Sequence, residues 1–408
     1  MKVFWTLGII LLVILKLNDL QTRKSRCDLI TEHGYPCEEH TFTTKDGYLL
    51  TMFRIPYSPV TKNQNLANKP PVLFMHCIYC SSDIFLLNGP NDGLPFMLVD
   101  RGYDVWLGNV RGNIYSQNHV QLSPWSRAFW NFTLDEIGRY DIAAKIDYII
   151  ARTGQPSTHF VGYSQGTAVF SILLSERPSY GEKIRSTHFL GQGVFLCHMK
   201  SLPVLSRAFV MGRPSMSWMG QYSSHSVDRL LNIIAPPICK WFATPCLMLF
   251  QFVVGWNSPH FNRTLLGDFL RTTPSAAGNL QTLHFYQSIK NCQFRKYDFG
   301  EKGNLAHYGT AEPPPYHLEA IQLKHPINIY YGDNDFIVSL KDVERLYNIL
   351  GNRTILRRIP YPKYNHLDLA LARDVKEVLN DCIVDQMQEY EGRSFKGNLC
   401  EHFNKNAF

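Results

Sequence analysis

The sequence lacks the long basic runs that mark nucleic-acid-binding proteins. Its 408 residues carry 41 Lys and Arg against 34 Asp and Glu, and the net charge of +7 is spread along the chain. Such charge supports solubility, with weak attraction to anionic lipid surfaces, and argues against nucleic-acid binding. Internal repeats and low-complexity tracts are also missing. A hydrophobic content of 45% suffices for one large core or two modest ones.

Long hydrophobic runs are scarce as well. One covers residues 3–15, follows Lys2 and precedes polar residues, which is the pattern of a signal peptide. Because this run is short for a membrane span, we predict a signal peptide over residues 1–22, with an uncleaved anchor as the alternative. The next most apolar run, residues 246–254, is shorter still, so no membrane span is predicted in the mature chain.

A second Cys pair or a His cluster at zinc spacing is missing too. Cys77-x-x-Cys80 resembles a redox or metal pair, but without further ligands it predicts no metal site, and we expect no cofactor. The ten cysteines favour the secretory route. Cys239 and Cys246 are spaced like a small disulfide loop, whereas the other pairings stay open. Three N-x-S/T sequons are glycosylation candidates: Asn131, Asn262 and Asn352.

What is present is an alternation of β-rich runs and helix-like segments. The helix-like segments include residues 135–151 and 340–350. Several of the β-rich runs are apolar on both faces, as in a buried parallel sheet, so the alternation predicts an α/β fold. The predicted strands cover residues 48–55, 72–75, 104–108, 159–162, 188–191, 327–332 and 355–359.

The regular alternation breaks over residues 199–325. An insertion of this size between core strands predicts a mainly helical cap or lid, and the alternative is an ordinary second lobe. The polar C-terminal residues are expected to be loosely ordered. The predicted organisation is a signal peptide (1–22), an N-terminal core part (23–198), a cap or lid (199–325), a C-terminal core part (326–387) and a polar tail (388–408).

The pentapeptide Gly162-Tyr163-Ser164-Gln165-Gly166 carries the strongest chemical signal. It follows an apolar run and precedes a helix-compatible one. This strand–turn–helix context is typical of a nucleophile elbow, in which a sharp turn presents the serine hydroxyl above the sheet of an α/β hydrolase. Glycine suits the two outer positions because a Cβ there would crowd strand against helix. The motif alone arises by chance, so it needs partners downstream.

Those partners are present in the order that an α/β hydrolase requires, serine then acid then histidine. An acyl-transfer serine needs a base to take its proton and a carboxylate to orient that base. Asp333 and Asp335 follow one predicted strand and His366 follows the next, so either aspartate fits. Each residue alone would be an ordinary turn or surface residue, but together they predict a triad with Ser164. The backbone N–H of Gln165 and one from the loop 76–79 would form the oxyanion hole.

At these residues the sequence resembles the acid lipase family of animals, which includes gastric and lysosomal acid lipases and many insect lipases. The insect branch is the nearest match, and the resemblance covers about residues 35–384. Its motifs lie at residues 34–40, 44–50, 54–56, 102–109 with 111–113, 129–130 with 135–138, 140–141, 164–166 and 365–368.

The resemblance implies Ser164 as nucleophile, His366 as base, Asp335 as acid, and Ile78 and Gln165 as oxyanion donors. It also implies a cap that covers the active site and opens at a lipid–water interface, with a cap disulfide like the possible Cys239–Cys246 pair. The implied reaction is hydrolysis of triacylglycerols or cholesteryl esters, often at acid pH and without metal or organic cofactor. The implied location is extracellular, with the lysosome as the alternative.

The sequence departs from the family at several positions. Cys77 stands where the family has glycine before the oxyanion residue, and a positive φ there would strain a cysteine. Cys77 therefore motivates an alternative, a non-catalytic or weakly active hydrolase-fold protein that binds lipid. A third possibility is an acyltransferase or thioesterase that uses the same triad. Tyr163 replaces the histidine of the family's elbow, and residues 201–246 match poorly.

Overall fold

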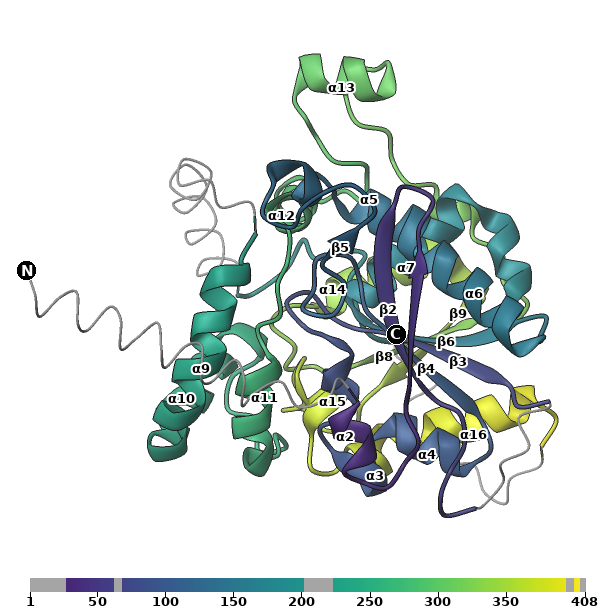
Figure 1. The fold of residues 1–408 in the computed structure, drawn as a ribbon, viewed down its shortest axis with the longest axis vertical. Coiled ribbons are helices and arrows are strands. Elements are labelled where there is room, and N and C mark those ends of the chain that lie inside the picture. Colours follow the sequence, from purple (N-terminus) through teal and green to yellow (C-terminus); the bar gives the residue numbers. More distant parts are fainter. Residues whose placement is uncertain (1–26, 62–67, 202–222, 394–399, 404–408) are drawn as a thin grey trace, which may run out of the picture.

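The computed structural model describes residues 27–61, 68–201, 223–393 and 400–403 (Figure 1). The predicted signal peptide, residues 1–22, lies outside these ranges. Within them, no helix is long and apolar enough to cross a membrane.

One mixed sheet forms the centre, with strand order β1-β2-β4-β3-β6-β7-β8-β9, and β5 pairs with β2. Neighbouring strands from β4 to β9 along this order are parallel, whereas β2 is antiparallel to β4. Each of the seven predicted strands matches a strand of this sheet. The strands are β1 (Glu38–Thr43), β2 (Tyr48–Ile55), β3 (Pro71–Met75), β4 (Asp104–Gly108), β5 (Asn118–His119), β6 (Thr158–Ser164), β7 (Ile184–Gln192), β8 (Ile327–Tyr331) and β9 (Thr354–Arg358).

Helices cover both faces of the sheet. The residues of β3 are therefore apolar on both sides of the strand. Val72 and Phe74 point into one core cluster, while Leu73 and Met75 point into the other. All five residues of β3 are buried, as expected for a parallel strand covered on both sides. The first cluster includes helices α4 (Leu94–Asp100), α15 (Asp368–Leu371) and α16 (Asp381–Tyr390), and the second includes α6 (Ala143–Thr153), α7 (Gln165–Glu176) and α14 (Leu340–Leu350).

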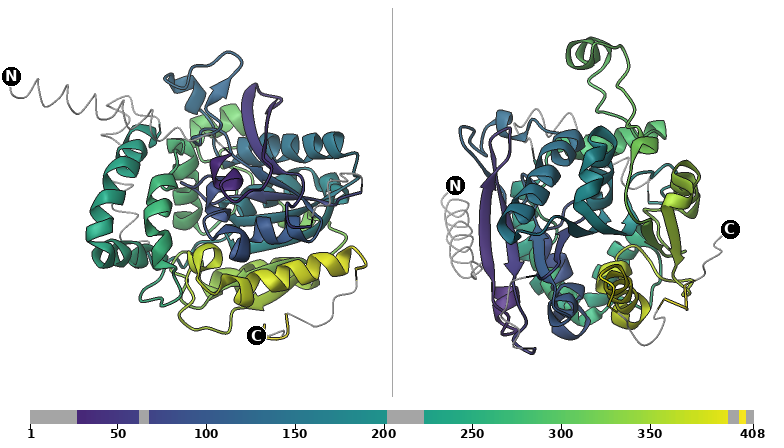
Figure 2. Two further views of the ribbon diagram at one scale, coloured as in Figure 1. Left: turned by 60° about the horizontal axis from the view of Figure 1, so that its bottom comes forward. Right: turned by 90° about the vertical axis from the view of Figure 1, so that its right-hand side faces the viewer.

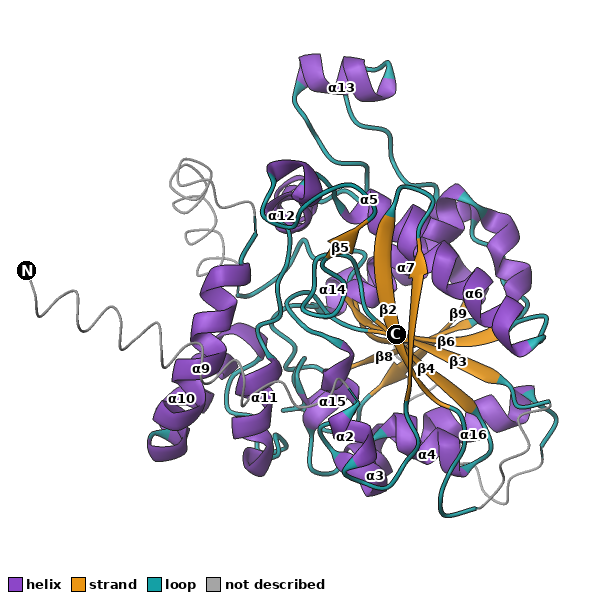
Figure 3. Cartoon of the chain, viewed as in Figure 1, coloured by secondary structure: helices purple, strands orange, loops and turns teal. Residues whose placement is uncertain are grey.

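The described residues between β7 and β8, 193–201 and 223–326, form helices and loops rather than further sheet strands (Figure 3). In Figure 1 and in the left view of Figure 2, α9, α10 and α11 stand beside the core. In Figure 1 and in the right view of Figure 2, α13 projects away from the body. The region contains α9 (His225–Trp241), α10 (Ala243–Val254), α11 (Leu266–Thr272), α12 (Asn279–Asn291) and α13 (Glu301–Tyr308). The remaining short α-helices lie elsewhere: α2 (Asp28–Thr31), α3 (Gly89–Asp92) and α5 (Leu134–Glu136).

All ten cysteines are paired in disulfides. The ring closed by Cys197–Cys292 spans 95 residues of sequence separation, and that closed by Cys77–Cys80 spans 3. Loop-closure entropy then assigns about 4.7 kcal/mol of stabilisation to the large ring and only about 2 kcal/mol to the small one. The five pairs are Cys27–Cys37, Cys77–Cys80, Cys197–Cys292, Cys239–Cys246 and Cys382–Cys400.

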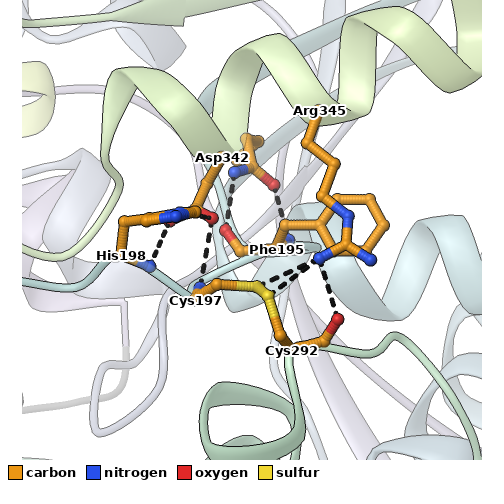
Figure 4. Close-up of a disulfide and its surroundings, with 7 residues drawn as sticks. Phe195, Cys197, His198, Cys292, Asp342 and Arg345 are labelled. Atoms are coloured by element: carbon orange, nitrogen blue, oxygen red, sulfur yellow. Dashed lines mark hydrogen bonds and ion pairs between the residues drawn. A yellow bond between two sulfur atoms is a disulfide. The ribbon is translucent and has the colours of Figure 1, made fainter.

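The Cys197–Cys292 disulfide ties the loop after β7 to the end of α12 (Figure 4). Arg345 of α14 lies over the Phe195 ring at 4.3 Å and donates to the Cys292 carbonyl oxygen at 2.8 Å. The buried Asp342 carboxylate accepts the Cys197 N–H at 3.1 Å. Covalent, cation–π and hydrogen-bond contacts thus join the helical region to the core at one point.

The described parts of the expected loose tail at 388–408, residues 388–393 and 400–403, are held more firmly than the sequence suggested. Helix α16 continues to Tyr390, and Cys400 is bonded to Cys382. Phe403 is only 2% exposed, with its ring 5.6 Å from that of Tyr330. The polar composition gave no sign of these contacts, because a single cysteine and a single phenylalanine make them.

His284 provides a pH-dependent link between α12 and the core. Its Nδ1 accepts the Leu134 N–H at 3.3 Å, and its Nε2 donates to the Arg295 carbonyl oxygen at 2.8 Å. This arrangement requires a neutral ring, and burial lowers the pKa of His284 to about 4. Since the unfolded chain binds the proton more readily, the stabilisation is complete above about pH 6.5 and is lost as the pH falls toward 4.

We therefore expect His284→Gln to lower the free energy of unfolding at pH 7, and to do so less at pH 4. The difference between the two pH values should reach up to about 3 kcal/mol, since each unit of pKa shift corresponds to about 1.4 kcal/mol. Urea unfolding at both pH values measures it. His317→Gln, at an exposed position, is the matched control. A His284→Gln effect of equal size at both pH values would contradict the linkage.

Candidate active site

The residues singled out in the sequence lie together at the carboxyl edge of the parallel strands. Ser164 ends β6, and Ile78 follows β3. Asp335 follows β8, and His366 follows β9. Loops after neighbouring parallel strands meet at this edge, which is where open α/β sheets bind their ligands.

The turn at Ser164 has the geometry of a nucleophile elbow. Ser164 has φ 52° and lies between the end of β6 and the first residue of α7. A Cβ added to Gly166 would lie 2.3 Å from the Met75 carbonyl oxygen, and one on Gly162 would lie 3.0 Å from the Thr167 nitrogen. The glycines therefore permit the close approach of helix and strands that the motif predicted.

The structure distinguishes the two aspartates that the sequence left open. The Asp335 Oδ2 lies 2.7 Å from the His366 Nδ1, and its Oδ1 accepts the backbone N–H groups of Ile337 and Val338 at 2.8 Å each. Asp333 instead forms an ion pair with Arg358 at 2.7 Å. Only Asp335 is therefore placed to orient an imidazole.

The imidazole of His366 is buried and held in one tautomer. Because Nδ1 donates to the Asp335 carboxylate, Nε2 is the acceptor nitrogen of the neutral ring. No described residue hydrogen-bonds this buried Nε2, Ser164 included. The absence of a side chain at Gly191 leaves room for the His366 ring, because a Cβ there would lie 2.8 Å from the His366 Cε1. An unpaired ring nitrogen beside an elbow serine can act as a base once the serine hydroxyl turns toward it.

Tyr163 supports His366 in a way that the sequence did not predict. The two rings are stacked, with centroids 5.2 Å apart and planes at 28°. The Tyr163 hydroxyl also donates to the His366 carbonyl oxygen at 3.0 Å. The residue that replaces the family's elbow histidine thus packs on the imidazole from the strand beneath it. The only signal in the sequence was its place next to Ser164.

The backbone strain that the sequence led us to expect at Cys77 is not found in the loop after β3. Among described non-glycine residues with positive φ, Tyr79 appears at 57° and Cys77 does not. Cys77 is instead bonded to Cys80, so neither sulfur is available to a metal.

The Ile78 N–H donates to no described residue. Gln165 begins α7, where N–H groups have no acceptor within the helix. Both N–H groups are therefore free to donate hydrogen bonds to a negatively charged oxygen.

Two helices of the inserted region hold the loops of this site. The Val254 carbonyl oxygen, at the end of α10, accepts the N–H groups of both His366 and Phe336 at 3.2 Å. From α12, Gln281 donates to the Gln165 side-chain oxygen at 2.6 Å, and the Thr282 and Tyr79 hydroxyls are hydrogen-bonded at 2.9 Å. Sequence reasoning missed these contacts because more than 80 residues separate the partners.

The other candidate residues lie away from this cluster. Asn131 and Asn352 are exposed, whereas Asn262 is half-buried and accepts the Thr264 N–H at 3.2 Å. Cys239 and Cys246 form the disulfide that their spacing suggested, and it joins α9 to α10. Within the described ranges no group of three or more His, Cys, Asp or Glu side chains could hold a metal ion.

Comparison with known proteins identifies the family. Residues 27–89 match the model of a partial alpha/beta-hydrolase lipase region, and residues 70–224 match that of the alpha/beta hydrolase fold. The chain is 37% identical to Lipase 3 of Drosophila melanogaster over 89% of this chain and 92% of that protein. This chain belongs to the α/β-hydrolase lipases. The lipase is also 34% identical to human Lipase member K (89% of this chain, 90% of that protein) and to human gastric triacylglycerol lipase (87% and 89%).

Solved structures agree on the fold of this lipase. A candidate aryl esterase from Burkholderia cenocepacia matches with a TM-score of 0.50 at 15% identity, covering 87% of this chain and 100% of that one. A candidate lipase from Sulfolobus solfataricus matches with a TM-score of 0.50 at 13% identity, covering 86% and 99%. The α/β-hydrolase prediction and the resemblance to acid lipases are both confirmed. The relatives favour an ester hydrolase over a non-catalytic lipid-binding protein.

The stacked tyrosine generates a test of how His366 is held. We expect Tyr163→Phe to lower kcat about fivefold, because it removes one hydrogen bond worth about 1 kcal/mol from His366, the candidate base. Hydrolysis of a soluble short-chain ester measures kcat. Tyr180→Phe is the matched control, since its hydroxyl donates to the exposed Asp147. Equal kcat values for the two variants would show that the Tyr163 hydroxyl does not position His366.

Proposed function

We propose that this lipase hydrolyses neutral lipid esters, such as triacylglycerols or cholesteryl esters, through an acyl-enzyme on Ser164. The observation that carries the proposal is the 2.7 Å contact of Asp335 with His366 beside the Ser164 elbow. The similarity to human gastric triacylglycerol lipase supports the substrate class.

In the proposed mechanism, Ser164 Oγ attacks the ester carbonyl while His366 Nε2 takes its proton. Asp335 holds the imidazole in the required tautomer and stabilises its positive charge. The N–H groups of Ile78 and Gln165 bind the oxyanion. His366 then protonates the leaving alcohol, and water attacks the acyl-enzyme with His366 again as the base. None of these steps requires a metal or an organic cofactor.

The two aspartates offer a matched pair of variants for this mechanism. We expect Asp335→Asn to lower kcat by about 10³- to 10⁴-fold, because the amide cannot stabilise the imidazolium. Asp333→Asn should keep kcat near the wild-type value, since Asp333 pairs with Arg358. The measurement is the hydrolysis of a soluble ester and of a triacylglycerol emulsion. Similar losses in both variants would contradict the assignment of the acid.

Ser164→Ala tests the nucleophile itself. We expect it to abolish hydrolysis and labelling by a fluorophosphonate, which modifies a serine only where a functional base activates it. Strong labelling of Ser164 in the wild-type protein would also exclude a purely lipid-binding role. Competition between water and a long-chain alcohol separates hydrolysis from acyl transfer. Unchanged hydrolysis by Ser164→Ala would refute the mechanism.

We further propose that α9 and α10 face the lipid–water interface. Trp241, the last residue of α9, is 82% exposed, and the α10 residue Leu249 is 69% exposed. An exposed apolar surface of this extent is typical of a site for a membrane or a partner. The other exposed apolar residues of this surface are Leu230, Leu231, Ile234, Ile238, Phe242, Met248, Phe252 and Trp256.

Leu249→Ser together with Phe252→Ser tests this surface. We expect triolein emulsion hydrolysis to fall at least about tenfold, because two large apolar side chains no longer leave water on binding, while the kcat for a soluble ester is unchanged. Val60→Ser is the control. Val60 is 71% exposed but precedes β3, at the amino edge of the parallel strands. Loss on both substrates, or equal loss in the control, would contradict an interfacial role.

A secretory route fits the five disulfides, which form in oxidising compartments. We propose a secreted protein, with the lysosome as the alternative destination. The exposed sequons at Asn131 and Asn352 are accessible to glycosylation.

A further inference from the structure

We propose that the Cys77–Cys80 disulfide is a positioning element for the oxyanion hole, because it fixes the direction in which the Ile78 N–H points. This inference rests on the proposed function, which makes that N–H an oxyanion donor. It explains why this chain has a cysteine where the resemblance expects a glycine. It also explains the cysteine three residues later.

The first step concerns the peptide group between Cys77 and Ile78. Its carbonyl oxygen accepts the His76 Nδ1–H at 2.8 Å and the Cys80 N–H at 3.3 Å. His76 is fixed in turn, since its Nε2 accepts the Val110 N–H at 3.3 Å. In a planar trans peptide the N–H points opposite to the carbonyl oxygen. Holding the Cys77 oxygen in the core therefore directs the Ile78 N–H away from it.

The second step concerns the turn that brings Cys80 back to Cys77. A four-residue turn with a positive φ at its third residue is normally built with glycine or asparagine there. Here Tyr79 occupies that place with φ 57°, a conformation that few residues with a Cβ adopt. The turn needs support from outside its own backbone preference, and the disulfide joins its first and last residues.

The third step concerns what else restrains the loop. Tyr79 is anchored by its hydroxyl on Thr282 and by its carbonyl oxygen, which accepts the Ser275 N–H at 2.5 Å. Both contacts hold Tyr79, which lies beyond the peptide that carries the Ile78 N–H. Cys77 and Cys80 are 7% and 5% exposed and pack in the core cluster that contains Tyr163. The disulfide is thus a buried clamp under the oxyanion peptide.

The location of this disulfide argues for a local role. A ring closed over a sequence separation of 3 removes less entropy from the unfolded chain than any of the other four disulfides, so its expected contribution to global stability is the smallest of the five. Its effect on the loop is larger, because it excludes turn conformations in which the Cys77–Ile78 peptide flips. A flipped peptide would present a carbonyl oxygen to the oxyanion, which is repulsive.

The test compares disulfide variants on a soluble short-chain ester. We expect Cys77→Ser with Cys80→Ser to lower kcat at least about tenfold and to change KM less than about threefold, because an oxyanion donor acts mainly in the transition state. Ile78→Pro, which removes the N–H, marks the full loss, on the order of 10²- to 10³-fold. Adding Tyr79→Gly to the double serine variant should restore most of kcat, since glycine adopts the positive φ unaided.

Cys27→Ser with Cys37→Ser is the matched control, because it removes a short-range disulfide far from this loop in the sequence. Its kcat should equal the wild-type value even where its Tm falls. A kcat within twofold of wild type for the Cys77/Cys80 variant overturns the inference. So does an equal loss in the control, or no recovery with Tyr79→Gly. Activity that survives Ser164→Ala would refute the proposed function and this inference with it, whereas the outcomes above refute the inference alone.

A second measurement uses the folded wild-type protein and covers the case in which the variant does not fold. A water-soluble phosphine converts the disulfide to two thiols and is itself oxidised to the phosphine oxide, with oxygen taken from water. Alkylation and peptide mass analysis show when Cys77 and Cys80 are reduced. We expect kcat to fall in proportion to their reduction and to recover on reoxidation. Full kcat with this pair reduced overturns the inference.

Discussion

The close approach of α7 to the end of β3 is the constraint on which the rest of the site depends. Gly166 brings the start of the helix within reach of the Met75 carbonyl oxygen, at a distance that a Cβ would not allow. As a result, Ser164 and the Gln165 N–H lie next to the loop that begins at His76. The proposed nucleophile and oxyanion donors are therefore positioned by one backbone contact, in a region where β3 and β6 are buried along their whole length.

The other half of the site comes from loops that are held from outside the core. Asp335 and His366 follow β8 and β9, and the loops that carry them are fixed by the Val254 carbonyl oxygen at the end of α10. The same helix presents exposed apolar side chains such as Leu249. In the proposed function, the element that meets lipid is thus hydrogen-bonded to the loops of the acid and the base. These hydrogen bonds are direct, from the Val254 carbonyl oxygen to the N–H groups of Phe336 and His366.

The loop at Cys77 shows how a departure from a family pattern can be absorbed. A cysteine in place of glycine suggested strain or lost activity. In the structure Cys77 has an ordinary φ, the positive φ falls on Tyr79, and the disulfide to Cys80 holds the turn. Tyr163 is a similar case, since it replaces a histidine and stacks on His366. Each replacement is accommodated by a contact of its own side chain: Cys77 forms a disulfide with Cys80, and Tyr163 stacks on His366.

The sequence by itself determined the α/β fold, the elbow at Ser164 and the order of the candidate triad, because these depend on local patterns: apolar runs, glycines beside a serine, and acids or histidine after strands. It could not choose between Asp333 and Asp335 from the residues alone, pair Cys77 with Cys80, or place Phe403 in the core. Only the tertiary structure decided these points, because each depends on which side chains meet across the fold. A hydrogen bond between residues 31 positions apart, such as that of Asp335 with His366, exists only after the strands have been ordered in the sheet.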